Sequence, residues 1–303
     1  MGRQLQAIAP IDRQEATLAV PASPFLKWAG GKSQLLKVYQ ELLPRRFARY
    51  FEPFLGGGAV FFHLANRHPG LRAILSDCNA ELINCYTIVR DHLPELIEAL
   101  KCHRNDRHHF YKVRAMDLEL LDQTERAARL IFLNRTCFNG LYRVNRKGQF
   151  NVPFGKYKNP KILDEINLTG CRSVLADADI SCQSFEHVVK RARTGDFVYM
   201  DPPYHPLNAT SNFTSYTNGA FRFEDQMRLA DVFRALDRKG CLVMLSNSDT
   251  PEIRELYQGY RIEVVLAARA INSRADRRGR INELVVLNYP NHFSLQKPSL
   301  HRV

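Results

Sequence analysis

The chain has little cysteine, and no arrangement of it binds zinc or builds a disulfide framework. Its 303 residues include seven cysteines, an odd number, with no Cys-x-x-Cys pair. The ten histidines show no metal-ligand spacing. No stretch approaches the roughly 18 uncharged apolar residues of a membrane-spanning helix, and no signal-peptide pattern opens the chain. We therefore expect a cytoplasmic protein with reduced thiols, no bound metal and no membrane contact.

Acidic residues are absent from one long segment. The chain carries 43 Lys and Arg against 31 Asp and Glu, a formal net charge of +12. Between Leu130 and Lys161 there is no acid, and the basic residues are Arg135, Arg143, Arg146, Lys147, Lys156, Lys158 and Lys161. Because ordinary solvated faces mix both signs of charge, this segment predicts nucleic-acid binding. A second basic cluster (Arg269, Arg274, Arg277, Arg278 and Arg280) has only Asp276 against it, and suits either a phosphate-clamping loop or an ordinary exposed hairpin.

Apolar runs that alternate with helical patterns predict an α/β fold. Strand-like runs recur at Tyr50–Phe54, Arg72–Asp77, Asp196–Met200, Cys241–Asn247, Arg261–Ala270 and Glu283–Tyr289. Helical segments such as Glu224–Arg238 separate most of them, which indicates a mostly parallel sheet with helices on both sides. The last two runs are joined without room for a long helix, so we expect the final strand to be antiparallel. Residues 1–22 read as a poorly ordered arm, and 291–303 as a tail.

The pattern changes between Asp77 and Leu163, where no strand separates the helical stretches. These stretches are Glu81–Arg90, Leu93–Cys102, Phe110–Met116 and Glu125–Asn134. Two short extended runs, Leu141–Val144 and Gln149–Val152, then flank Asn145-Arg146-Lys147-Gly148, which is a hairpin signal with cations in its turn. A helical insert that ends in a basic hairpin suits a DNA-reading module.

A short motif, Asp201-Pro202-Pro203-Tyr204, follows the apolar run Phe197–Met200. Open α/β sheets bind ligands at the carboxyl edge of their strands. Proline has a fixed φ and no N–H, so Pro202 and Pro203 stiffen the loop and leave carbonyl oxygens as acceptors. Asp201 and the Pro202 carbonyl would then accept from an exocyclic amino group on a planar ring, with Tyr204 as a stacking wall. The alternative is a chance turn, since Asp-Pro-Pro occurs in ordinary loops.

Two glycine-rich segments lie upstream of that motif. The run Tyr50 to Gly58 ends in Gly56-Gly57-Gly58, and Asp77 follows 21 residues after Gly56, where a carboxylate meets ribose hydroxyls in dinucleotide folds. A dinucleotide fingerprint that starts at Gly56 would place Phe61 at the third glycine, which argues against NAD. The segment Phe25 to Ser33 includes Gly30-Gly31-Lys32-Ser33, but Leu26 stands where a P-loop needs glycine. A simple Gly-Gly turn before a helix remains the alternative there.

Taken together, these segments resemble one family, the Dam-type DNA adenine-N6 methyltransferases. The resemblance runs from Phe25 to Tyr289. It rests on Lys27-Trp28-Ala29-Gly30-Gly31-Lys32, Glu52-Pro53-Phe54-Leu55-Gly56-Gly57-Gly58, Asp77, Asp201-Pro202-Pro203-Tyr204, Leu133-Asn134-Arg135, Phe138-Asn139-Gly140-Leu141, Asn151-Val152-Pro153-Phe154-Gly155 and the run from Pro206 to Thr214.

The resemblance implies a Rossmann-like sheet that uses S-adenosyl-L-methionine. The catalytic domain would be discontinuous, over residues 23–78 and 164–290. A helical DNA-recognition domain would occupy residues 79–163, with its basic hairpin at 137–158. The implied target is the adenine of GATC in double-stranded DNA.

The resemblance also assigns roles to single residues around the cofactor. Asp201, Pro202, Pro203 and Tyr204 would form the catalytic loop, with Asp201 also near the cofactor. Trp28 and Lys32 would lie near the methionine part, with Lys32 pairing its carboxylate. Asp77 would bind the ribose, Phe185 would pack on the adenine, and Phe54, Gly56 and Gly58 would line the site. An aromatic at position 185 also fits a core role.

A further set of residues would contact DNA. The matching positions are Arg135, Phe138, Asn139, Leu141, Arg143, Pro153, Lys156 and Tyr157. We expect Arg143 to contact guanine with two hydrogen bonds in the major groove. Phe138 stands where many relatives have tyrosine, and would wedge into the base stack. Lys156 replaces a frequent arginine and favours a phosphate role, and Lys27, Arg146 and Lys147 are interpreted as phosphate contacts.

Two alternatives to this function stay open from the sequence. One is an amino-methyltransferase acting on RNA or on a protein glutamine, which leaves the hairpin and the Asn208–Thr214 match without a purpose. The other is a DNA-binding regulator without turnover, which has no need of acceptors at Asp201. We expect a monomer or weak dimer. The resemblance is compatible with a cognate restriction endonuclease that acts independently.

Overall fold

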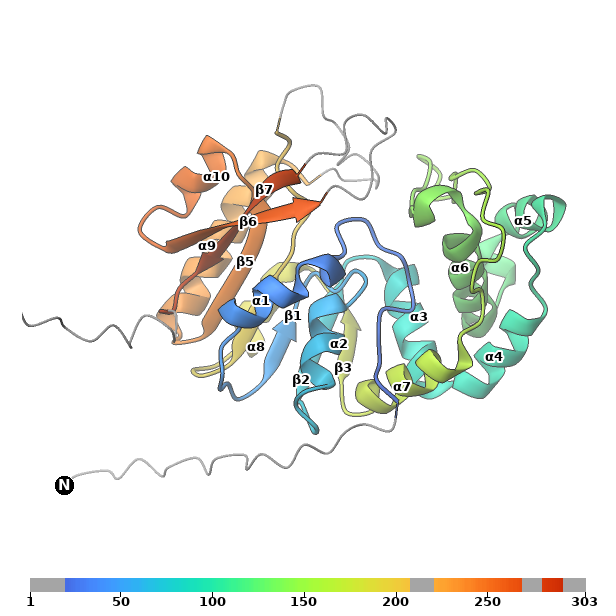
Figure 1. Ribbon diagram of the computed structural model, residues 1–303, viewed down its shortest axis with the longest axis horizontal. Helices are drawn as coiled ribbons and strands as arrows, with labels where there is room; N and C mark the ends of the chain where they lie inside the picture. The colour runs from blue at the N-terminus through green and yellow to red at the C-terminus, as the bar shows by residue number, and fades with distance from the viewer. Residues whose placement is uncertain (1–19, 208–220, 269–279, 291–303) are drawn as a thin grey trace, which may run out of the picture.

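A computed structural model describes residues 20–207, 221–268 and 280–290 of the chain. Within these ranges seven strands form one sheet, in the order β3-β2-β1-β4-β5-β7-β6 (Figure 1). The strands are β1 (Tyr50–Glu52), β2 (Ala73–Asp77), β3 (Asp179–Cys182), β4 (Phe197–Met200), β5 (Leu242–Ser248), β6 (Arg261–Ala268) and β7 (Arg280–Leu287). Five of these seven sit side by side in parallel, so their carboxyl ends meet at one edge of the sheet.

The last strand runs against its neighbours, as the sequence predicts. β7 pairs antiparallel with both β5 and β6, for example Ser248 with Glu283 and Val265 with Glu283. The sheet is therefore mostly parallel with an antiparallel final strand. This pairing places Glu283 next to the carboxyl end of β5, which becomes important at the site.

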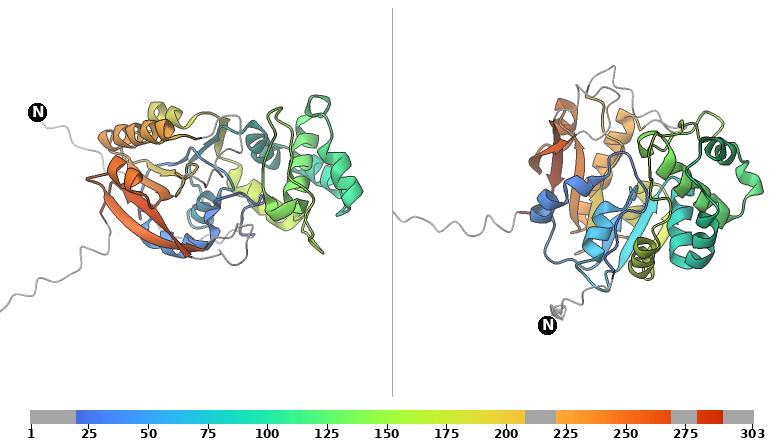
Figure 2. Two further views of the ribbon diagram at one scale, coloured as in Figure 1. Left: turned by 90° about the horizontal axis from the view of Figure 1, so that it is seen from above. Right: turned by 45° about the vertical axis from the view of Figure 1, so that its right-hand side comes forward.

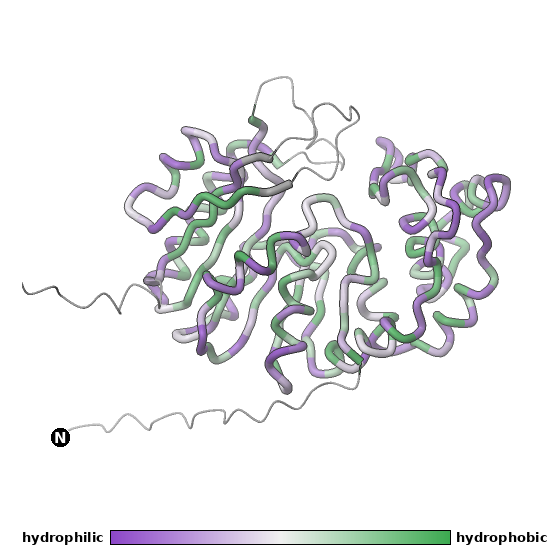
Figure 3. The backbone as a smooth tube through the Cα atoms, in the orientation of Figure 1, coloured by the Kyte–Doolittle hydropathy of each residue, from purple (hydrophilic) through white to green (hydrophobic). Residues whose placement is uncertain are grey.

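Helices cover both faces of the sheet because its central strands are apolar on both faces. In β4, Tyr199 packs into one core with Leu75 and Val285, whereas Val198 packs into the other with Val243. The first core is covered by α1 (Leu36–Leu42), α2 (Ala59–Ala65), α3 (Ala80–Asp91) and α7 (Glu165–Leu175); the second is covered by α8 (Val188–Arg191), α9 (Phe223–Arg238) and α10 (Pro251–Leu256). Figure 2 shows this layering, and in Figure 3 the hydrophobic colour concentrates in the strands.

Local sequence signals explain where several helices begin. Asn79 caps α3 by accepting from the Leu82 amide at 3.1 Å. Asp122 and Glu125 form a reciprocal capping box at the start of α6 (Gln123–Thr136). Thr250 accepts from the Ile253 amide, and Pro251 occupies the first turn of α10, as the sequence predicts.

The helical insert lies between the neighbouring strands β2 and β3. After α3 it contains α4 (Leu93–Lys101), α5 (Arg107–Arg114) and α6, which lie to the right of the sheet in Figure 1. Helix α6 belongs to two cores, because Leu130 and Ile131 join the first core of the sheet while Phe132 and Leu133 join a smaller third core with Phe110. The domain limits at residues 79 and 163 stay a prediction.

The basic hairpin forms its turn but hardly any ladder. The Asn145 side chain accepts from the Lys147 and Gln149 amides, and Gly148 takes φ +75° in the turn. The expected strands Leu141–Val144 and Gln149–Val152 reduce to one isolated bridge, Val144 to Phe150, and a second bridge outside them joins Cys137 to Phe154. A short 3-10 turn, η3 (Phe138–Gly140), precedes them. Packing of Tyr142 on Trp28 and of Phe150 into the third core takes the place of a regular ladder.

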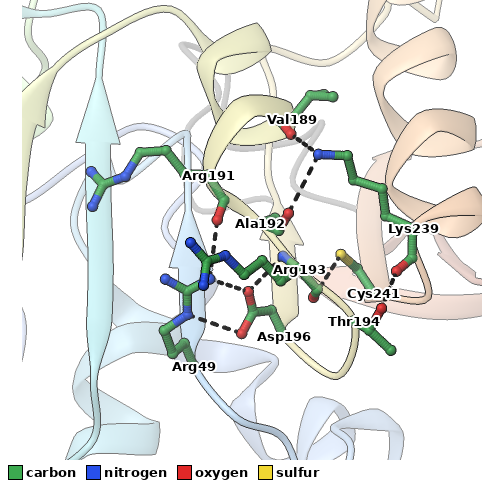
Figure 4. A network of polar contacts seen from close by, with 9 residues as sticks. All are labelled: Arg49, Val189, Arg191, Ala192, Arg193, Thr194, Asp196, Lys239 and Cys241. Carbon is green, nitrogen blue, oxygen red and sulfur yellow. Dashed lines mark hydrogen bonds and ion pairs between the residues drawn. The ribbon is translucent and has the colours of Figure 1, made fainter.

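A polar network links the amino ends of neighbouring strands, at the edge of the sheet opposite the predicted site (Figure 4). Arg49, just before β1, donates to both carboxylate oxygens of Asp196, just before β4, at 3.1 and 2.6 Å, and to the Arg191 carbonyl. The Thr194 hydroxyl donates to the Lys239 carbonyl at 2.7 Å. These contacts fix the starts of β1, β4 and β5 relative to one another, and therefore also their far ends.

Some predictions fall on residues outside the described ranges. They are most of the arm 1–22, the tail 291–303, the run from Asn208 to Thr214, and the arginines 269, 274, 277 and 278. Among the described residues, no helix is long and apolar enough to cross a membrane. The same residues contain no group of three or more His, Cys, Asp or Glu placed to hold a metal ion.

Candidate active site and nucleic-acid interface

Asp201 lies at the carboxyl end of β4, held by hydrogen bonds on both carboxylate oxygens. The Lys32 ammonium, from the 3-10 turn η1 (Lys32–Gln34), lies 2.7 Å from Oδ2, and the Ser246 hydroxyl on β5 donates to Oδ1 at 2.7 Å. The Lys32 side chain is 4% exposed and that of Asp201 is 18% exposed. Each carboxylate oxygen keeps a second lone pair for a ligand. The structure shows that Lys32 pairs with Asp201, while the expected contact of Lys32 with the cofactor stays a prediction.

The rest of the loop is fixed from two sides. The Tyr204 hydroxyl donates to Glu283 Oε2 on β7 at 2.8 Å, and the Lys32 ammonium lies over the Tyr204 ring, 4.8 Å from its centroid. The Pro203 carbonyl accepts from the buried Gln226 side chain on α9 at 3.0 Å. Gln226 is held in turn by Asn247 on β5 at 2.9 Å. A loop tied at both ends presents its acceptors in one fixed arrangement.

The glycine-rich loop after β1 and the end of β2 lie beside each other at the same sheet edge. Gly56 and Gly58 take φ +48° and +66°, in the left-handed region that glycine tolerates. Asp77 accepts from the Gly56 amide at 3.1 Å and from the Asn79 amide at 3.0 Å. Burial raises the pKa of Asp77, and these backbone bonds oppose that rise. The loop thus places glycine backbone directly beside a carboxylate, an arrangement that fits a hydroxyl-bearing ligand.

We expect Gly58→Ala to lower the free energy of unfolding by more than Gly70→Ala. Both glycines have φ near +70°, which costs an L-residue about 1–2 kcal/mol. A Cβ at Gly58 would also lie 2.8 Å from the Tyr86 hydroxyl, which donates to the Gly56 carbonyl, whereas nothing lies within 4 Å at Gly70. Thermal and denaturant unfolding of the two variants measure the difference. Equal losses would show that the Tyr86 contact relaxes without cost.

Three aromatic side chains predicted to line the cofactor site also pack on protein. Trp28 stacks on Tyr142 of the insert, with ring centroids 5.2 Å apart, and its indole covers Gly56. Phe185 is buried in the second core and stacks on Phe54 at 5.3 Å. The core role that the sequence left open for Phe185 is therefore realised, while its contact with a cofactor adenine stays a prediction.

Glu52, to which the sequence analysis gives no role of its own, carries a buried carboxyl group near this site. Glu52, the last residue of β1, accepts from the Tyr50 hydroxyl at 2.8 Å and from the Phe61 amide at 3.1 Å. Burial raises the pKa of Glu52 to about 8, with the nearby Asp201 carboxylate adding to the rise. The group ties β1 to the start of α2, and so fixes the glycine-rich loop between them.

The predicted DNA-contacting residues divide into an exposed group and a packed group. Exposed on the basic segment are Phe138 (47% exposed), Arg146, Lys147, Pro153 and Lys156. Arg135 and Leu141 are packed among neighbours. Burial lowers the pKa of Arg135, and Leu141 contacts the third core. Lys161 pairs with Asp164 at 2.7 Å, so one of the seven cations of the segment is balanced from outside it.

The remaining members of that set are held by specific contacts. The Arg143 guanidinium donates to Asn151 through Nε (2.5 Å to Oδ1) and an Nη (3.1 Å to the carbonyl). Lys27 lies over the Tyr157 ring, 4.1 Å from its centroid, and burial lowers the pKa of Lys27. Asn139 takes φ +55°, a value that is rare for a residue other than glycine. The next residue, Gly140, has no Cβ and so leaves room for the Lys27 side chain.

This sheet order, with an antiparallel β7 and an Asp-Pro-Pro-Tyr turn at its carboxyl edge, defines a Rossmann-like methyltransferase. The chain belongs to the D12 class of N6 adenine-specific DNA methyltransferases, whose sequence model matches residues 28–271. Its substrate is therefore DNA, and its fold and family imply use of S-adenosylmethionine.

Named relatives cover nearly the whole chain. It is 47% identical over 276 residues to the type II methyltransferase M1.LlaDCHI of Lactococcus lactis subsp. cremoris, covering 88% of this chain and 96% of the relative. It is 45% identical to the type II methyltransferase M.MjaIII of Methanocaldococcus jannaschii, covering 88% and 99%. The DNA adenine methylase of Escherichia coli strain K12 is 37% identical, covering 90% and 98%.

Proposed function

We propose that this enzyme methylates N6 of the adenine in GATC, acting on a base flipped out of duplex DNA. The observation that carries the proposal is the Asp201 to Tyr204 loop at the carboxyl end of β4, with Asp201 held by Lys32 and Ser246. GATC is the target that the resemblance to Dam-type enzymes implies. The exposed cations of residues 137–158 support a duplex partner.

Asp201 and the Pro202 carbonyl would accept the two N–H groups of the target amino group. The adenine N6 lone pair is delocalised into the ring, so N6 is a poor nucleophile. Two acceptors favour a more tetrahedral nitrogen, and Asp201 then orients and polarises N6 without first removing a proton. The Pro203 carbonyl already accepts from Gln226, so the proposal gives the second acceptor role to the Pro202 carbonyl.

An adenine inside a duplex does not expose N6 to this loop, so the base must leave the stack. The Tyr204 ring would stack on the flipped base. Phe138, exposed on the basic segment, would fill the space that the base leaves. The aromatic ring and exposure of Phe138, and the position of the Tyr204 ring in the same loop as Asp201, support these two roles.

The residues at the carboxyl edge fit S-adenosylmethionine. Glycines with positive φ bring backbone close to a ligand, and Asp77 offers acceptors for ribose hydroxyls. Trp28, Phe54 and Phe185 supply apolar surface. When bound, the cofactor supplies an electrophilic methyl group on a sulfonium. The protein's part is positioning and electrostatics around N6.

We expect DNA from a methylation-free host that expresses this chain to resist an endonuclease blocked by adenine methylation at GATC. The matched control is the same host expressing Asp201→Ala, whose DNA should be cut. Full cutting with active, soluble wild-type protein would contradict GATC as the target. Single-base mapping of N6-methyladenine in the same DNA would then give the true sequence.

We expect Arg143→Ala to narrow the preference for GATC over one-base variants, with little change in salt dependence. Its bonds to Asn151 use two of five N–H donors, so three are available for guanine. A guanine contact contributes roughly 1–3 kcal/mol of discrimination. Measuring kcat/KM on GATC and on a guanine-substituted duplex at several salt concentrations tests this.

Lys147→Ala is the matched comparison, because Lys147 is exposed in the hairpin turn. A phosphate contact weakens binding to all sequences alike and changes the salt slope by about one unit. Lys147→Ala should therefore leave the sequence preference intact while it flattens the slope. If Arg143→Ala leaves the preference unchanged, another residue reads the guanine.

A further inference from the structure

Glu283 contacts the catalytic loop from a strand far away in the sequence. Its Oε2 accepts from the Tyr204 hydroxyl at 2.8 Å across 79 residues of chain. The antiparallel pairing of β7 with β5 and β6 fixes its backbone on both sides, opposite Ser248 and Val265. Glu283 therefore anchors the loop to a strand that is paired on both sides.

The charged groups that face Glu283 are those of the catalytic centre. Lys32 and Asp201 both act on it electrostatically, in opposite directions, and burial raises the pKa of Glu283. Lys32 also lies over the Tyr204 ring. The ring is thus restrained at its hydroxyl by Glu283 and at its face by Lys32.

A stacking platform works only when its plane is fixed. A phenol ring with an unrestrained hydroxyl can still turn about its two side-chain torsions where the backbone that carries it is fixed. A hydrogen bond from the hydroxyl to a strand residue limits both the tilt and the swing of the ring.

We propose that Glu283 is a positioning residue for methyl transfer, which holds the Tyr204 ring in the plane on which the flipped adenine stacks. The proposal rests on the proposed function, in which Tyr204 stacks on the target base. Glu283 itself touches neither substrate nor cofactor in this assignment.

The test compares Glu283→Ala, Glu283→Gln, Tyr204→Phe and the double variant Glu283→Ala with Tyr204→Phe, all in the full chain. Glu263→Ala is the control, because Glu263 lies on the neighbouring strand β6 and pairs with Arg261 away from the loop. Single-turnover methyl transfer to DNA from a methylation-free host gives the rate without assuming the target sequence. Dissociation constants for S-adenosylmethionine and for DNA are measured alongside.

We expect Glu283→Ala to lower the rate about 10- to 100-fold, the range for losing a hydrogen bond to a carboxylate. Tyr204→Phe should lose a similar amount, and the double variant no more than the larger single loss, because both remove the same bond. Glu283→Gln, which keeps an acceptor oxygen, should retain more activity. Both dissociation constants and the Glu263→Ala rate should stay near wild type.

A near-normal rate for Glu283→Ala, or losses that multiply in the double variant, would overturn the proposal. Loss of cofactor binding in both Glu283 variants would also overturn it, in favour of a structural role. A wrong GATC assignment shifts where the wild type methylates and leaves these rate ratios unchanged. Base flipping is tested separately, with the wild-type enzyme and a duplex that carries 2-aminopurine at the mapped target. Unchanged 2-aminopurine fluorescence on binding would show that the base is not flipped, whatever the Glu283 variants do.

Discussion

Replacing Asp201 with alanine should lower the single-turnover rate of methyl transfer by at least ~100-fold, the scale on which a lost transition-state hydrogen bond acts. The substitution removes the side-chain acceptor that we propose for N6 and also leaves Lys32 without its carboxylate partner. DNA binding should survive, because the exposed cations of the basic segment lie on the insert and not on this loop. Quenched-flow transfer of labelled methyl groups measures the rate, and a mobility-shift titration measures the binding.

Asp231→Ala is a suitable control for that variant. Asp231 is an exposed acid on α9 that pairs with Arg234, so its loss changes the net charge equally without touching the site. Its rate should match the wild type. If Asp201→Ala turns over at a near-normal rate, another group orients N6 and the acceptor role assigned to Asp201 is wrong.

Replacing Lys32 with methionine should destabilise the fold as well as reduce the rate. Breaking a buried ion pair from one side costs about 3–5 kcal/mol, because an unpaired charge remains. We expect a loss near the lower end of that range, since the Asp201 side chain is 18% exposed and can regain some hydration. Denaturant unfolding gives the free energy, and single-turnover transfer gives the rate.

A double variant separates the two effects of Lys32. Lys32→Met combined with Asp201→Asn removes both charges of the ion pair, so it should be more stable than Lys32→Met alone while it remains inactive. Lys37→Met, at an exposed lysine on α1, should change neither property. A double variant less stable than the single one would show that the ion pair does not account for the loss.

The position of the Asp201–Tyr204 loop at the end of β4 could be predicted from sequence because its signals are local. The apolar residues of β4 are consecutive, and a rigid Asp-Pro-Pro-Tyr follows at once, so strand and motif identify each other. The same holds for Asp77 at the end of β2 and for the capped start of α10. The sequence does not predict the edge strand β3, because Asp179–Cys182 has a single large apolar residue and is partly exposed along its length.

The partners of the loop could not be predicted, because sheet register decides them. Ser246 and Glu283 lie 45 and 79 residues beyond the groups they bind. A usable signal was present in Ser246-Asn247-Ser248, three polar residues that end the otherwise apolar strand β5. Polar side chains that are fully buried need partners, and here those partners are Asp201, Gln226 and the His205 carbonyl.

Helix α6 fixes the distance between the sheet and the hairpin, because it packs into the first core and into the third core. Its 14 residues span about 21 Å at 1.5 Å per residue. Leu130 and Ile131 pack into the first core, and Phe132 and Leu133 pack into the third core. A helix buried in two cores has no hinge between them. If the hairpin reads the target sequence as proposed, the fixed position of α6 sets the distance between the base that is read and the base that is methylated. A change of recognition sequence should then come through substitutions on the hairpin and seldom through a change of spacing.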